Sequence, residues 1–126
     1  MWITELKENE VFVFGSNLRG AHSAGAAKQA LEKFGAKRGE GFGHFGKSFA
    51  LPTKDENIET LPLDRIKVYV DQFIKYAENN PQLTFLLTPV GTGLAGIPAE
   101  KMAPLFKDAP LNVILPKEFA EILDVD

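Results

Sequence analysis

The 126-residue chain contains no cysteine and has only two histidines, His22 and His44. The absence of cysteine excludes disulfides, thiolate catalysis, and zinc or iron–sulfur sites with cysteine ligands. Two histidines, which do not form an H-x-x-x-H motif, are too few for a typical catalytic zinc site. We therefore expect neither a metal site nor a bound cofactor.

The sequence also lacks a long apolar run and a surplus of basic residues. No apolar run approaches the length of about 18 residues that crosses a membrane, and the first residues lack the basic and apolar segments of a signal peptide. Fourteen basic against seventeen acidic residues give a net charge of −3. Proteins that follow nucleic-acid backbones usually carry a basic excess. We therefore expect a cytoplasmic protein with no membrane partner, and the charge disfavours nucleic acid as a partner.

The composition is that of a globular protein, with 44% hydrophobic and 25% charged residues. The length suits a single domain, which we expect to span residues 1–126. Apolar, β-prone runs predict strands over residues 11–14, 48–52, 83–88 and 111–115. Apolar periodicity and end signals predict helices over residues 23–34, 63–77, 99–106 and 117–123, the third kinked or shortened by Pro104. Residues 35–47 contain five glycines and are predicted to be a loop. This alternation predicts an α/β fold, a three-layer α/β/α sandwich that binds ligands at the carboxyl ends of its strands.

Two segments match the G-x-G-x-x-G phosphate-loop motif, residues 41–46 and residues 91–96. The first leads into a predicted strand, so it lacks the strand-then-helix context that the motif needs. The second follows a predicted strand and precedes a helix that begins near Pro98, which suits phosphate binding. Too few residues follow Gly96 to complete a dinucleotide fold, so this loop is a phosphate-site candidate in a different fold.

A second candidate binding segment follows the first predicted strand. Gly15, Ser16 and Asn17 stand at the carboxyl end of that strand, where open α/β sheets bind ligands. Asn17 can donate and accept hydrogen bonds, which suits a sugar hydroxyl, and Gly15 permits close backbone approach. Gly20 and Gly25 then lead through a small-residue loop into a helix. The two strand–loop–helix segments resemble two walls of one pocket for a diphosphate, although the same glycines also suit ordinary turns.

Three further side chains are candidates for chemistry. Lys54 follows a predicted strand on the same edge, where it can neutralise a phosphate, act as a nucleophile, or remain a solvated turn residue. His22 can serve as a general base or face a ligand as a donor, or have neither role. His44, between Phe42 and Phe45, can stack on a base or close a loop over the core. The sequence leaves these alternatives open.

Together these features resemble the macro domain, a family of ADP-ribose-binding modules. The matching features are a strand that ends in Gly-Ser-Asn, a small-residue loop before a helix, and the segment TPVGTGLAGIP at residues 88–98. The resemblance covers about residues 11–115 and implies a macro-like mixed sheet of about four to six strands. The chain also resembles small bacterial and phage proteins that share F-G-S-N, P-T-K-D and G-x-G-L-A-G patterns.

The resemblance implies roles for individual residues. Asn17 matches the asparagine that contacts the distal ribose. The residues expected to line the ligand site are Gly15, Ser16, Gly20 and Gly25 in the first segment and Thr92, Gly93, Leu94 and Gly96 in the second. Lys54 is similar to the reactive lysine of the terminal ADP-ribose glycohydrolase branch, but the acid that this branch carries after G-x-G-L is replaced here by Ala95. Binding is therefore better supported than catalysis.

We thus expect the chain to bind ADP-ribose, an ADP-ribosylated macromolecule or a related nucleotide diphosphate. If it hydrolyses an ADP-ribosyl linkage, the expected catalytic residues are Asn17, Lys54 and His22, with water activated by the ligand's own diphosphate. One alternative is a non-enzymatic interaction or sensor module, related to phages or defence, whose glycines are structural. Another is recognition of single-stranded nucleic acid, which the net charge disfavours. The basic residues beside Phe42 and Phe45 that would serve it are Lys28, Lys33, Lys37, Arg38 and Lys47.

Overall fold

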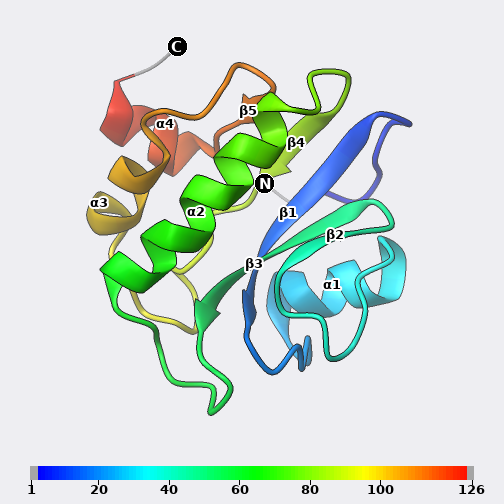
Figure 1. The fold of residues 1–126 in the computed structure, drawn as a ribbon, viewed down its shortest axis with the longest axis vertical. Coiled ribbons are helices and arrows are strands. Elements are labelled where there is room, and N and C mark those ends of the chain that lie inside the picture. The colour runs from blue at the N-terminus through cyan, green and yellow to red at the C-terminus, as the bar shows by residue number, and fades with distance from the viewer. Residues whose placement is uncertain (1–2, 125–126) are drawn as a thin grey trace.

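The apolar runs of the sequence pair into one mixed sheet in the computed structural model, which describes residues 3–124 (Figure 1). Its strands are β1 (Glu10–Asn17), β2 (Gly43–Phe45), β3 (Ser48–Lys54), β4 (Thr84–Leu87) and β5 (Val113–Ile114). They lie in the order β2-β3-β1-β4-β5, and every pairing is parallel except that of β2 with β3. The predicted α/β class and a mixed sheet of four to six strands are confirmed.

The helices lie close to their predicted positions. They are α1 (Gly25–Lys33), α2 (Leu63–Glu78), α3 (Ala99–Met102) and α4 (Lys117–Leu123), with a 3₁₀ helix, η1, over Ala103–Phe106. The predicted helix 99–106 therefore changes type midway, at the turn that contains Pro104. Proline has no N–H to donate to an α-helical carbonyl, which explains the shortened α3. No helix within residues 3–124 is long and apolar enough to cross a membrane.

The sheet has an apolar core on each of its faces because alternate residues of β1 point to opposite sides. Phe12 and Phe14 pack with Ala27 and Ala30 of α1, whereas Val11 and its neighbours face a larger cluster. That larger cluster contains buried residues of α2, α3, η1 and α4. In Figure 1, α1 accordingly lies apart from the other helices. Helices therefore cover both faces of the sheet, and α1 packs through small alanines that let it approach closely.

The prediction that residues 35–47 form only a loop is wrong. They include β2, which pairs with β3 in a hairpin whose Phe45 lies opposite Ser48. The turn between the two strands uses Gly46, whose φ of +59° lies in the left-handed region that glycine adopts without strain. The strands β1 and β3 also run further than predicted, because Gly15 and Ser16 still pair with β3.

Candidate functional site

A cleft of about 460 Å³ opens at the edge of the sheet where three parallel strands end. Its lining comes from the end of β1 and the chain up to the first turn of α1, from the end of β3 and the loop after it, and from the segment after β4. The chain leaves β1 toward α1 on one face and leaves β4 toward α3 on the other. Such a reversal between neighbouring strands is where open α/β sheets bind their ligands.

Most of the residues predicted for the site meet at this cleft. Those that line it are Gly15, Ser16, Asn17, His22, Gly25, Lys54, Thr92, Gly93 and Leu94. Gly20 and Gly96 do not line it. Each of these two glycines has a φ of +73° and takes part in a turn next to the cleft. They shape the two loops rather than facing a ligand.

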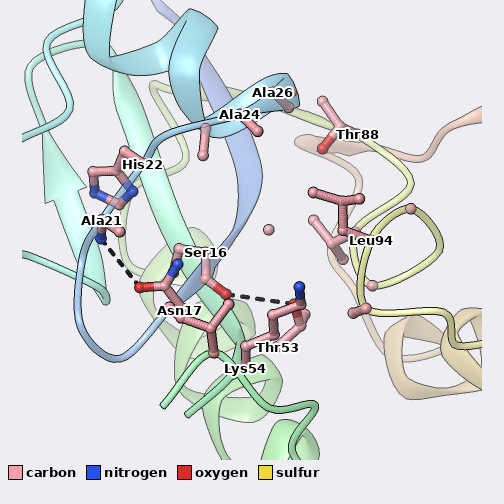
Figure 2. Close-up of a pocket in the computed structure, with 18 of the residues that line it drawn as sticks. Ser16, Asn17, Ala21, His22, Ala24, Ala26, Thr53, Lys54, Thr88 and Leu94 are labelled. Atoms are coloured by element: carbon pink, nitrogen blue, oxygen red, sulfur yellow. Dashed lines mark hydrogen bonds between the residues drawn. The ribbon is translucent and has the colours of Figure 1, made fainter. Parts of the chain in front are cut away.

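Asn17 lines the cleft with a side-chain amide of which only the oxygen is hydrogen-bonded in the part of the chain that the structure describes. Its Oδ1 accepts a hydrogen bond from the backbone N–H of Ala21 at 3.1 Å (Figure 2). That bond orients the side chain, and within residues 3–124 its Nδ2 makes no hydrogen bond. Two N–H donors of Asn17 therefore remain for a ligand oxygen.

The glycine-rich segment of residues 35–47, for which the sequence predicted no role in the site, supports this wall of the cleft. The hydroxyl of Ser16 donates to the Gly41 carbonyl, and the N–H of Gly39 donates to the Gly20 carbonyl at 2.9 Å. A Cβ on Gly20 would lie 2.5 Å from the Glu40 nitrogen, so the two loops touch backbone to backbone. Sequence reasoning missed this role, although five glycines in thirteen residues (35–47) signalled close backbone contact.

One ring nitrogen of His22 has a hydrogen-bond partner, and the other has none within the described residues. Its side chain is 1% exposed and meets Phe14 edge to face, with ring centroids 5.2 Å apart. Nε2 lies 3.1 Å from the Glu40 carbonyl and must donate, because a carbonyl oxygen only accepts. Nδ1 is buried and has no partner within the described residues, and the backbone φ is +47°. An unpaired buried acceptor costs about 1–3 kcal/mol, so His22 carries two local costs beside the cleft.

The amino end of α1 reaches the cleft without a cap. Ala24 occupies the N-cap position with extended backbone angles, and no side chain bonds the first turn. The first turn also has no acidic residue, and Gly25, Ala26 and Ala27 all line the cleft. The first N–H groups of a helix have no partner within it and carry partial positive charge. This helix end is therefore open to an anion.

The segment after β4 forms the opposite wall. The hydroxyl of Thr92 donates to the Pro89 carbonyl at 2.7 Å, which leaves its oxygen lone pairs as acceptors. A Cβ on Gly93 would meet no atom within 4 Å, so its backbone is open to close approach. Leu94 is 81% exposed and reaches into the cleft from this side (Figure 2).

The charged side chains that line the cleft are cations. They are Lys54, which was predicted, and Arg19, which sequence reasoning missed although it lies two residues after Asn17. Among residues 3–124, no Asp or Glu lines the cleft. The carboxylate of Asp55, next to Lys54, accepts instead from the N–H groups of Asn57 and Glu59 at 2.8 and 3.0 Å. The cleft therefore favours an anion, and it has no carboxylate to act as a general acid or base.

His44 lies outside the cleft and bridges two elements. Its Nε2 donates to the Gly46 carbonyl at 3.0 Å, and its Nδ1 accepts from the hydroxyl of Tyr76 on α2 at 2.5 Å. Of its two sequence interpretations, the structure supports closure of a loop over the core. Burial raises the pKa of the Tyr76 hydroxyl above its ordinary value, which keeps that donor protonated.

Within the described residues, no three His, Asp or Glu side chains gather so that they could hold a metal ion. The cleft offers backbone N–H groups, one side-chain amide and two cations. No family model, curated protein or solved structure matches this chain, so its function has to be argued from the chemistry of this cleft.

Proposed function

We propose that this chain binds ADP-ribose or a related nucleotide diphosphate in the cleft, in the manner of a macro domain. One observation carries the proposal: the uncapped amino end of α1 lines the same cleft as Lys54 and Arg19, and no carboxylate of the described part of the chain lines it. Backbone N–H groups at a helix start together with cations are the usual partners of phosphate oxygens. A ligand with two adjacent phosphates can contact the helix start and the two cations at once.

The rest of the lining suits a sugar attached to that diphosphate. Asn17 keeps two N–H donors for ribose hydroxyls. Phe42, Phe45 and Phe49 do not line the cleft, so these aromatic side chains leave room for a ligand. This openness favours ligand binding over the alternative of a non-enzymatic interaction module whose glycines are only structural.

Calorimetric titration with ADP-ribose, NAD and AMP tests the proposal. We expect ADP-ribose to bind, and we expect Lys54→Ala to weaken its binding by roughly 10- to 100-fold, since a hydrogen bond to a charged group contributes about 1.5–3 kcal/mol. Lys107→Ala is the matched control, because Lys107 is exposed and does not line the cleft. Absence of ADP-ribose binding at millimolar concentration would contradict the proposal.

Hydrolysis of an ADP-ribosyl linkage is a separate question for the same cleft. Because no carboxylate lines it, water would be activated by the ligand's own diphosphate, oriented by Asn17, with Lys54 or His22 assisting. We expect Asn17→Ala and Lys54→Ala each to slow release of ADP-ribose from a modified protein or nucleic acid. Unchanged turnover in both variants would remove them from catalysis while leaving the binding proposal intact.

A further inference from the structure

Ile58, on the loop after β3, has a backbone conformation that its side chain disfavours. Its φ is +63°, in the left-handed region where a β-branched residue is a genuine outlier. Asparagine tolerates this region far better, and Asn57 stands one position too early to occupy it. Nothing in the core requires isoleucine here, because Ile58 is 36% exposed. The chain therefore keeps a costly apolar residue at a surface position.

That surface position is the rim of the cleft. Ile58 lines it together with Lys54 and Leu94. The loop of Ile58 is fixed by the Asp55 carboxylate, which accepts from two backbone N–H groups, and by the Ile58 N–H, which donates to the Asp55 carbonyl at 3.1 Å. Ile58 is therefore held in place before any ligand arrives.

The loops of Ile58 and Leu94 are also tied to each other. The hydroxyl of Thr60 donates to the Ala95 carbonyl at 2.8 Å, and Thr60 forms a β-bridge with Lys54. Leu94 is exposed yet directed into the cleft (Figure 2). Two apolar side chains on two linked loops thus stand at a rim where the charged lining is cationic.

We propose that Ile58 and Leu94 form an apolar clamp on the pentose ring attached to the diphosphate. A pentose has a C–H face, which apolar side chains can cover, and hydroxyls, which suit Asn17. Asn17 lies opposite Lys54 in the β1–β3 register, so the amide and the loop of Ile58 start from neighbouring positions. This inference rests on the proposed function. It adds a reason for ligand selectivity, because a sugar diphosphate contacts the clamp and inorganic diphosphate does not, so the sugar diphosphate binds more tightly.

The test measures the binding of ADP-ribose and of inorganic diphosphate to the whole chain and to the variants Ile58→Asn and Leu94→Ala. We expect each variant to weaken ADP-ribose binding roughly tenfold and to leave diphosphate binding unchanged, since burial of part of one apolar side chain contributes about 1.4 kcal/mol. Val68→Ala is the control, because Val68 is half exposed on α2 and does not line the cleft.

Thermal unfolding of the same variants separates a ligand role from a structural one. Ile58→Asn should leave the melting temperature unchanged or raise it, because asparagine accepts the left-handed backbone. A lowered melting temperature, or an equal loss of affinity for both ligands, would overturn the clamp. If the unmodified chain binds inorganic diphosphate as tightly as ADP-ribose, the clamp fails while the proposed function stands. If it binds neither ligand, the proposed function itself fails.

Discussion

At the scale of single residues, one wall of the cleft depends on its contacts with the glycine-rich segment of residues 35–47. Ser16, Gly20 and Gly41 join the end of β1 to the glycine-rich loop behind it. His22 joins the same loop through the Glu40 carbonyl. Because backbone touches backbone here, small changes of volume should move Asn17 and His22 together.

Gly41→Ala tests this support. An alanine Cβ at this position would collide with the Asn17 carbonyl oxygen, so we expect the free energy of unfolding to fall by roughly 2 kcal/mol or more. Gly93→Ala is the matched control, since its Cβ would meet no atom within 4 Å. Thermal or urea unfolding of the two variants makes the comparison. Equal stability of both would mean that the contact between the loops is not required.

Tyr76 gives a prediction about pH. Its pKa is raised above 10.0 by burial, so the folded state holds this proton more tightly than the unfolded state. The resulting stability is fully present below about pH 10, the pKa of an unfolded tyrosine, and is lost as the pH rises above it. Tyr76→Phe should weaken this alkaline loss and should lower stability at neutral pH by about 1 kcal/mol, because His44 loses its donor.

Unfolding of wild type and Tyr76→Phe, followed from about pH 8 to pH 11, measures the effect. Tyr69→Phe is the control for removal of a tyrosine hydroxyl, since Tyr69 lies on α2 as Tyr76 does and packs on Phe42, but makes no hydrogen bond to His44. An alkaline slope in Tyr76→Phe as steep as that of wild type would show that Tyr76 does not cause it.

At the scale of elements, α1 gives up stability at its amino end. Serine, threonine, aspartate or asparagine at the N-cap usually satisfies the first N–H groups, but Ala24 cannot. The same N–H groups line the cleft, so the missing cap leaves them for a ligand. The missing cap is what the proposed binding of an anion at this helix start requires.

Ala24→Asp tests this conflict between stability and binding. The extended backbone of Ala24 suits a capping side chain, so we expect the variant to be more stable by about 0.5–2 kcal/mol. The new carboxylate also occupies the helix start and repels an anion, so ADP-ribose binding should weaken. Melting temperature and calorimetric affinity should then move in opposite directions. A more stable variant with unchanged affinity would remove the helix start from the proposed site.

At the scale of the whole molecule, the site exists because of the order of the strands. β1 lies between β3 and β4 with all three parallel, so the segments that follow them meet although they are far apart in the sequence. The chain carries a net charge of −3, yet its cleft is lined by cations alone among the charged residues. The net charge of a chain thus gives little guidance about the sign of the field in one cleft.

The sequence by itself was enough to predict the α/β class, the two walls of the cleft and the position of α4. These features follow from local signals, because apolar runs specify strands and the 3.6-residue period specifies helices. Most predicted ligand residues lie at the cleft for the same reason, since the carboxyl ends of parallel strands share one edge.

Only the tertiary structure decided what depends on distant partners. The segment before β2 supports the end of β1 and His22, because the Gly39 N–H donates to the Gly20 carbonyl and the His22 side chain donates to the Glu40 carbonyl. The fold also brings Arg19 and Ile58 to the lining of the cleft. It places His44 beside Tyr76 of α2, and their hydrogen bond gives His44 a structural role. The hydrogen bonds of Ser16, His22 and His44 join residues 18 to 32 positions apart, so no local pattern of the sequence encodes them.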